Sequence, residues 1–272
     1  MRRYIMAFLT TSALTPPEMV RIASELGYSD VGFRLMPNAP GAIQQYMLGR
    51  PSVMRETLAT MKDTGIGVFD VEIVRMGPGF DLSTYGPLID AAAELGAQAL
   101  PVAGDDNDLT RLSDNYARLC ECVGALGMRA DVEFMPFTAI KTARDAERML
   151  ELAGSPASGG ILVDTLHVDR SGMSVDDLRR LPRELIHYAQ ICDAPTLAKN
   201  GTPFTIAEMI LTAREERLLP GEGGIDLGTI FKALPPDLTV GVEIPHAIRM
   251  PQAGPREWAR QALAAAKSVI EP

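Results

Sequence analysis

The chain alternates short apolar runs, typical of buried β-strands, with stretches of helical periodicity, and this alternation occurs eight times. The strand-like runs fall near residues 3–9, 30–35, 67–75, 98–103, 129–135, 160–164, 185–192 and 238–244. The helical stretches fall at 16–27, 51–64, 83–95, 109–127, 142–154, 174–181, 205–216 and 255–270. Eight strand–helix units of this size predict a closed (β/α)8 TIM barrel of the α/β class rather than an open doubly wound sheet.

The composition favours one domain over residues 1–272. An apolar content of 46% is ample for one large core, and no linker or low-complexity tract divides the sequence. The longest connection is an extended loop over residues 194–224, after the seventh strand, which also holds a predicted helix. Long loops at the C-terminal face of such barrels usually carry function, so this one is a candidate lid or substrate clamp.

Charge and cysteine content exclude several classes of partner. A net charge of -9 argues against a nucleic-acid partner, because phosphate backbones select clustered Lys and Arg. No apolar run is long enough to span a membrane, and the first residues lack the apolar core of a signal peptide. Three cysteines fit reduced thiols, so we expect a cytoplasmic protein that binds a small-molecule substrate. Association into a homo-oligomer stays open.

Polar side chains occur near the carboxyl ends of the last four predicted strands, namely Glu133, Asp164, Gln190 and Glu243. Parallel barrel strands bring these ends to one face, where three unpaired carboxylates would repel one another. A shared divalent cation removes the repulsion. An all-oxygen ligand set favours Mn²⁺ or Mg²⁺, with Zn²⁺ or Co²⁺ still open. The alternative is that each acid pairs with an arginine or faces water.

Five further side chains are candidates for substrate binding. His167 lies three residues after Asp164, and an anionic substrate would need a fixed guanidinium, for which Arg217 is the first choice and Arg34 the second. Glu72 lies in the predicted strand 67–75 and is a candidate to orient an arginine or a substrate hydroxyl, and His246 follows the last strand and can reach the mouth of the barrel. A solvated helix face around Arg217 and a structural histidine at His167 remain the alternatives.

The chain resembles the xylose isomerase-like TIM barrels over nearly its whole length. The family pattern has a Glu in strand five, Asp-x-x-His after strand six, a His or Gln in strand seven, a Glu in strand eight and a PGxGxID turn. In this chain the corresponding residues are, in the same order, Glu133, Asp164 with His167, Gln190, Glu243 and residues 220–226. Strand seven more commonly carries His in this superfamily. Gln190, followed by Asp193, is closer to the hydroxypyruvate isomerase branch.

The resemblance implies a metal-dependent isomerase or epimerase of a small hydroxycarbonyl compound such as a sugar, a ketose or a hydroxy-keto acid. The metal would stabilise an enediolate, while Glu133 and Glu243 would act as base and acid from different sides. A metal-dependent lyase or dehydratase is the alternative enzyme, and a non-catalytic binding barrel is a second reading. An endonuclease of this superfamily would need many histidine ligands, and the chain has 3 histidines.

Overall fold

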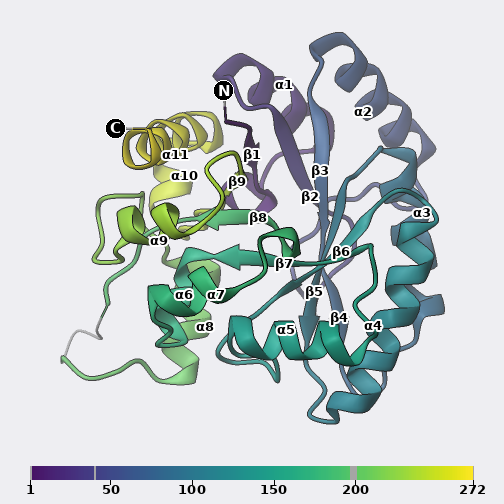
Figure 1. Ribbon diagram of the computed structural model, residues 1–272. Helices are drawn as coiled ribbons and strands as arrows, with labels where there is room; N and C mark the ends of the chain where they lie inside the picture. The colour runs from purple at the N-terminus through teal and green to yellow at the C-terminus, as the bar shows by residue number, and fades with distance from the viewer. Residues whose placement is uncertain (1, 40, 197–200, 272) are drawn as a thin grey trace.

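A computed structural model describes residues 2–39, 41–196 and 201–271 (Figure 1). Parallel strands pair in the order β3-β2-β1-β9-β8-β7-β6-β5-β4, and a pairing between β3 and β5 at Asp70 and Ala99 closes the sheet. The strands are β1 (Tyr4–Met6), β2 (Asp30–Arg34), β3 (Gly67–Glu72), β4 (Val74–Met76), β5 (Ala99–Gly104), β6 (Arg129–Glu133), β7 (Gly159–Asp164), β8 (Ile186–Ile191) and β9 (Thr239–Val242). Because Ile73 interrupts a single barrel strand to give β3 and β4, the result is the eight-stranded barrel that the sequence predicts.

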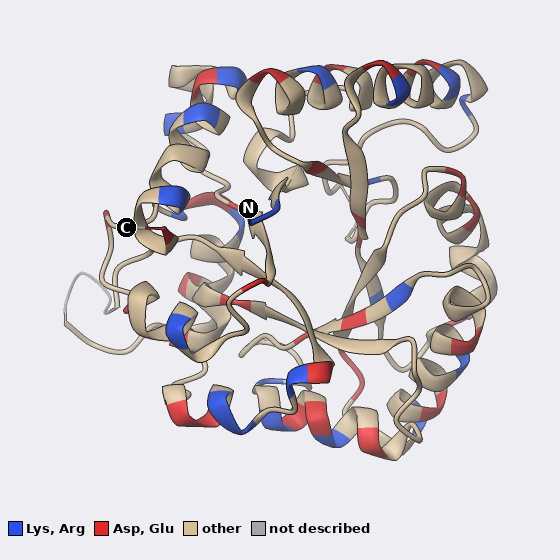
Figure 2. Ribbon diagram, turned by 45° about the horizontal axis from the view of Figure 1, so that its top comes forward, with Lys and Arg blue, Asp and Glu red and all other residues tan. Residues whose placement is uncertain are grey.

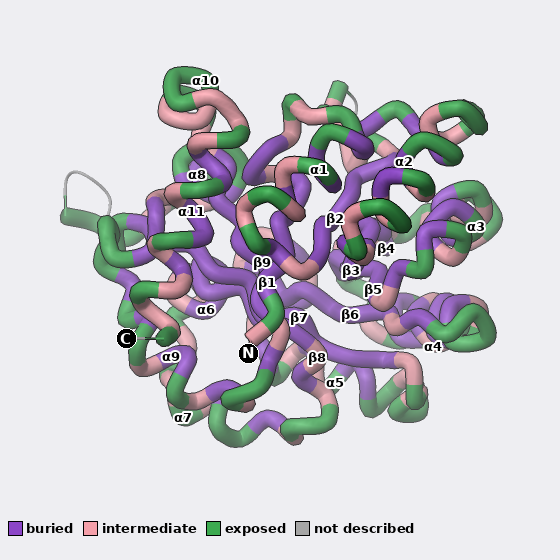
Figure 3. The backbone as a smooth tube through the Cα atoms, turned by 90° about the horizontal axis from the view of Figure 1, so that it is seen from above, coloured by how far each residue is buried: buried purple, intermediate pink, exposed green. Residues whose placement is uncertain are grey.

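Helices surround the barrel and carry most of its charged residues on their outer sides, whereas the strands are buried (Figures 2 and 3). The helices at the predicted positions are α1 (Pro16–Leu26), α2 (Pro51–Thr64), α3 (Gly86–Glu94), α4 (Leu109–Gly124), α5 (Ala143–Leu152), α7 (Val175–Arg180), α8 (Ile206–Glu215) and α11 (Pro255–Ile270). A capping box of Thr142 and Asp145 starts α5, and Gly27 in the left-handed conformation ends α1. No helix in the described ranges is long and apolar enough to cross a membrane.

Three short helices lie at positions that the sequence patterns do not predict. They are α6 (Thr165–Arg170) directly after β7, α9 (Leu227–Ala233) after the long connection, and α10 (Arg249–Ala253) after β9. The connection expected at 194–224 contains α8, and residues 197–200 within it lie outside the described part. The helix that follows β8 in the usual barrel rhythm is therefore α9, and α8 is an addition.

The interior of the barrel contains both apolar and polar side chains. Ile5, Phe69, Ala99, Leu162 and Tyr188 form a small apolar cluster there. Strict alternation from Gln190 would turn His187 toward the helices, but its ring instead lies against Asp131 and Phe69. The pairing of β7 with β8 shifts register between Ile161 and Leu162, and this bulge turns the His187 ring inward, where Nδ1 lies 2.6 Å from Asp131 Oδ2.

Candidate metal centre

Three of the predicted ligands lie side by side because their strands are adjacent. Glu133 ends β6 and pairs with Leu162 of β7, while Asp164 at the end of β7 pairs directly with Gln190 of β8. Asp164 also starts α6, since its Oδ1 accepts hydrogen bonds from the backbone N–H groups of Leu166 and His167. This cap places the ring of His167 over the barrel mouth.

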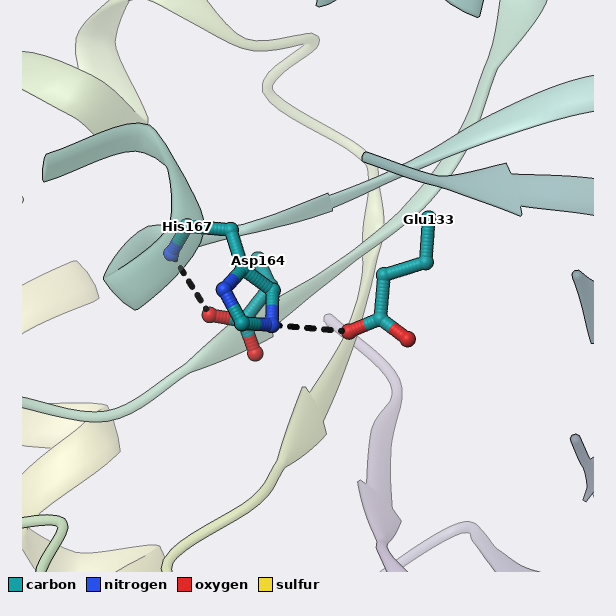
Figure 4. A group of neighbouring side chains, drawn as sticks. All are labelled: Glu133, Asp164 and His167. Atoms are coloured by element: carbon teal, nitrogen blue, oxygen red, sulfur yellow. Dashed lines mark hydrogen bonds and ion pairs between the residues drawn. The ribbon is translucent and has the colours of Figure 1, made fainter. Parts of the chain in front are cut away.

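Glu133, Asp164 and His167 form a buried group whose potential ligand atoms all lie within 4.8 Å of one another (Figure 4). The Nε2 atom of His167 is 3.5 Å from Glu133 Oε1. The other ring nitrogen of His167, Nδ1, is buried and has no hydrogen-bond partner among the described residues. The sequence predicts His167 as a substrate contact, whereas its position here also makes it a possible ligand.

The amide of Gln190 completes the oxygen-rich side of this group. One end of the amide lies 3.3 Å from Glu133 Oε1 and 3.2 Å from Asp164 Oδ2. If the amide nitrogen of Gln190 is at that end, it donates hydrogen bonds to both carboxylates. If the amide oxygen is at that end, three oxygen atoms face one another, and only a cation between them stabilises this arrangement. The donor set therefore fits a divalent ion. Glu133, Asp164, Gln190 and His167 are the residues that would hold it.

Glu243 lies at the same mouth but is held by an arginine. Arg217 is 2% exposed, and its Nη1 lies 2.5 Å from Asp164 Oδ2 while its Nη2 lies 2.8 Å from Glu243 Oε2. The arginine pairing that the sequence left as an alternative for each acid therefore occurs at Asp164 and Glu243. Glu243 lies outside the group of mutually close ligand atoms and is joined to it through Arg217.

Burial and charge shift the pKa values of these groups in opposite directions. Burial raises the pKa of Glu243 well above its usual range, although Arg217 opposes the shift. Burial acts in the same direction on Asp164, but there Arg217 and His167 outweigh it and lower the pKa. Asp164 and Glu243, which share the Arg217 guanidinium, thus differ in their tendency to hold a proton.

Most of the N–H donors of the Arg217 guanidinium are directed at groups of the protein itself. Besides the two carboxylates, Nε donates to the carbonyl of Ala213, and Nη1 lies 3.4 Å from both Cys192 Sγ and the carbonyl oxygen of Glu243. Burial raises the pKa of the Cys192 thiol to about 12, so the neighbour of Arg217 is a neutral thiol. Arg217 links β7, β8, β9 and α8, a role for which a motif search gives no signal.

Backbone pairing between three loops holds Arg217 in place. Asp193 pairs with Leu218 in an antiparallel bridge, and Glu216 pairs with His246 in another. The N–H of Arg217 also donates to the carbonyl of Pro245 at 3.0 Å. The loops after β8 and β9 are thus joined across the mouth. These pairings connect residues far apart in sequence, so local patterns do not predict them.

The remaining candidates lie elsewhere on the mouth. Arg34 and Glu72, at the ends of β2 and β3, form a buried ion pair with Nη2 and Oε1 3.2 Å apart, and the Arg34 guanidinium lies over the Phe8 ring. His246 is half-buried, and its Nδ1 accepts hydrogen bonds from the N–H groups of Ile248 and Arg249, so it caps the start of α10. Only its other nitrogen is left to face a substrate.

An apolar wall was not predicted from the sequence. Ile73, Ala103 and Met135 form a separate buried cluster with Phe137 packed against it, at the ends of β3, β5 and β6. The ring of Phe137 meets that of His167 edge-on, with centroids 5.5 Å apart. The candidate metal centre therefore has one apolar and one charged side. A surface hollow of about 440 Å³ between α5 and α7 contains none of these residues.

The model of one protein family matches residues 20–269, and its description is xylose isomerase-like TIM barrel. The chain belongs to this family. The resemblance seen in the sequence motifs is thereby confirmed, and so is the barrel fold. None of the curated proteins matches the sequence significantly.

Solved structures of the same fold are distant in sequence. The IolI protein with a bound zinc atom is 16% identical, has a TM-score of 0.79, and the match covers 99% of this family member and 98% of that chain. The probable 3-DHS dehydratase AsbF of Bacillus anthracis is 15% identical with a TM-score of 0.76, covering 97% and 98%. The 3-keto-D-glucoside 4-epimerase YcjR of E. coli is 17% identical with a TM-score of 0.69, covering 98% and 100%. At these identities, the likeness shows a shared fold.

Proposed function

We propose that this protein is a divalent-metal-dependent isomerase or epimerase of a small hydroxycarbonyl compound, such as a sugar, a ketose or a hydroxy-keto acid. The observation that carries the proposal is the convergence of Glu133, Asp164, His167 and the Gln190 amide at the C-terminal end of the barrel. Active sites of (β/α)8 barrels lie at this end, and oxygen ligands favour Mn²⁺ or Mg²⁺. His167 among the close groups, together with the zinc-bound IolI structure, supports Zn²⁺ as the other candidate.

When bound, the metal would supply Lewis-acid stabilisation of negative charge on the substrate oxygens. Two carboxyl groups of this chain are placed to move the substrate proton. Glu133 is the proposed base, and the ring of His167, whose Nε2 lies 3.5 Å from Glu133 Oε1, orients its carboxylate. Glu243, whose pKa burial raises, is the proposed proton donor on the other side, oriented by Arg217.

Residues of the outer mouth would bind the substrate's hydroxyl groups and any anionic group. Arg34 and Glu72 present a buried charged pair near the acids, and Coulombic effects of both Glu133 and Arg217 on the pKa of Glu72 show that these groups are close. The wall of Ile73 and Met135 would exclude water from the opposite side. We propose substrate contacts for Arg34, Glu72, His167 and His246, and a positioning role for Arg217.

A dehydratase is the second candidate. The likeness to AsbF, described as a probable 3-DHS dehydratase, covers 97% of this chain and supports it. The same base and metal serve both reactions, because elimination follows proton removal when a leaving group is attached at the β carbon. The choice between them depends on the substrate.

The test begins with elemental analysis of the purified protein, followed by NMR in deuterated water with panels of hydroxycarbonyl compounds. An isomerase or epimerase would exchange the substrate's α-hydrogen for deuterium without losing water, whereas a dehydratase would give an unsaturated product. Glu133→Gln and Glu243→Gln should each lower the rate of the exchange reaction by at least about 100-fold. A chain that binds no divalent ion, or glutamine variants that keep full turnover, would contradict the proposal and favour a non-catalytic binding barrel.

A further inference from the structure

The loop after β8 wraps around a buried carboxylate, that of Asp193. Asp193 is 2% exposed, and its side chain accepts hydrogen bonds from three backbone N–H groups. Oδ1 accepts from Ala194 at 2.8 Å and from Ile225 at 3.1 Å, and Oδ2 accepts from Gly221 at 2.9 Å. Both oxygens are thus bound by the loop backbone, the way that loops bind a free anion.

The fit between the loop and this carboxylate is close. A Cβ atom at Gly223 would lie 2.2 Å from Asp193 Oδ1 and 2.5 Å from the carbonyl oxygen of Ala194. Any side chain at Gly223 would therefore push the loop away from Asp193. Gly224 donates its N–H to the same carbonyl of Ala194 at 2.9 Å, which fixes the turn further.

The backbone of Asp193 lies next to that of Arg217. The backbone of Asp193 pairs with Leu218 in both directions, at 3.0 Å and 2.8 Å, and Leu218 directly follows Arg217. Arg217 in turn holds Asp164 and Glu243. A chain of direct contacts therefore runs from the Asp193 carboxylate through the loop to the candidate metal centre.

In many (β/α)8 barrels, the loops after the seventh and eighth strands bind a substrate phosphate with backbone N–H groups. Here β8 is the seventh strand of the barrel, and backbone N–H groups of the loop that follows it donate hydrogen bonds to the Asp193 carboxylate. We infer that Asp193 is a built-in anion that occupies this phosphate position, that it positions Arg217, and that the substrate of the reaction proposed above carries no phosphate group. The substrate part of this inference rests on the proposed function.

Five arginines in the described part of the chain agree with this inference, because carboxylates of the chain already neutralise them. Arg34 pairs with Glu72, Arg75 with Asp105, Arg170 with Asp169, Arg217 with Asp164 and Glu243, and Arg249 with Glu222. A phosphate dianion would have to displace one of these carboxylates. A neutral or singly charged substrate needs no such exchange.

The first experiment uses the wild-type protein loaded with Mn²⁺ and titrates inorganic phosphate, with sodium chloride of equal ionic strength as the control. The Tm, followed by circular dichroism, should change by less than about 1 °C beyond the chloride control, because Asp193 occupies the backbone N–H groups that would bind phosphate. A saturable rise in Tm with phosphate would overturn the inference. This measurement needs no substrate, so it stands even if the proposed function fails.

The second experiment removes the built-in anion with Asp193→Ala. The Tm should fall by at least about 5 °C, because three N–H groups lose their acceptor. Formate, which replaces the missing carboxylate, should restore at least half of the loss, whereas the wild type should not respond. The Mn²⁺ affinity should rise when Arg217 is no longer held against Asp164 and Glu243, and formate should return it to the wild-type value, as expected of a positioning residue. If formate changes neither the stability nor the metal affinity of Asp193→Ala, the inference is contradicted.

Asp193→Asn provides a variant that keeps the shape of the side chain. Its single carbonyl oxygen can accept some of these hydrogen bonds, so its Tm should lie between those of the wild type and Asp193→Ala. If the alanine variant does not fold, the Tm of the asparagine variant decides. A Tm equal to that of the wild type would overturn the role of the carboxylate.

The substrate part is tested with matched compounds, each ketose or hydroxy-keto acid assayed with and without a phosphate ester. Deuterium exchange should occur with the unphosphorylated member of a pair, at least about tenfold faster than with its phosphate ester. Faster exchange with the ester would overturn the inference. If neither member of any pair exchanges, the proposed function fails, and the phosphate titration and formate rescue still decide the role of Asp193.

Discussion

Replacing Arg217 by methionine tests the electrostatics of the candidate site most directly. Methionine keeps most of the length of the side chain but removes the positive charge that lies between Asp164 and Glu243. Because Arg217 is 2% exposed, water does not take over its role. The variant leaves two buried carboxylates with less compensation.

Breaking a buried ion pair by removing one partner typically costs about 3–5 kcal/mol. Two carboxylates lose a partner here, so the free energy of unfolding in EDTA should fall by about that amount. A divalent ion should recover part of the loss, since it supplies the missing positive charge; an ion at about 100 times its Kd contributes about 2.7 kcal/mol. Mn²⁺ should therefore stabilise Arg217→Met more than it stabilises the wild type.

The assay is urea unfolding followed by circular dichroism, in EDTA and in excess Mn²⁺. Arg214→Met is the matched control, because Arg214 is an exposed arginine of α8, three residues before Arg217, and its loss should change stability by less than about 0.5 kcal/mol. A loss below about 1 kcal/mol for Arg217→Met in EDTA would refute the account of the ion pairs. An equal response of both proteins to Mn²⁺ would refute a metal site at these carboxylates.

Three other substitutions give separate tests. Burial raises the pKa of the Asp70 carboxyl, which accepts a hydrogen bond from Tyr188, so the wild type loses stability as the pH rises above the usual carboxyl pKa. Asp70→Asn has no such loss. In urea unfolding, the free energy of unfolding of the variant relative to the wild type should therefore increase from about pH 4 to about pH 8. Gln190→Leu should weaken Mn²⁺ binding by more than about tenfold in calorimetry, with little change in Tm in EDTA. Gly160→Ala should lower the free energy of unfolding by about 1–3 kcal/mol, because its Cβ would lie 2.1 Å from Asp131 Oδ1.

The strands were predictable from sequence because each is a short apolar run with helical periodicity on either side. The same periodicity predicts α2 and α11 at the residues where they occur, 51–64 and 255–270. The short helices α6 and α10 have 6 and 5 residues, too few to show a period of 3.6. Their starts depend on local contacts, such as the Asp164 side chain that caps α6.

The errors at the site arise from interactions between distant segments. Alternation predicts an outward His187, but a bulge next to it reverses the direction of the side chain. The sequence names both Arg217 and Glu243, yet nothing local indicates that they pair, because the contact depends on how the loops after β8 and β9 join across the mouth. Residue type and strand end predict which side chains reach the mouth, and only the fold determines their partners.

Charge balance connects these features to the proposed metal. Among the described residues that surround the candidate metal centre, the carboxylates of Glu72, Glu133, Asp164 and Glu243 outnumber the guanidinium groups of Arg34 and Arg217 by two. Part of this excess is offset by protonation, since burial raises the pKa of both Glu72 and Glu243. One divalent cation would neutralise the remainder and allow these groups to ionise. Adding a phosphate dianion would restore the excess, which is the electrostatic reason to expect an uncharged or singly charged substrate.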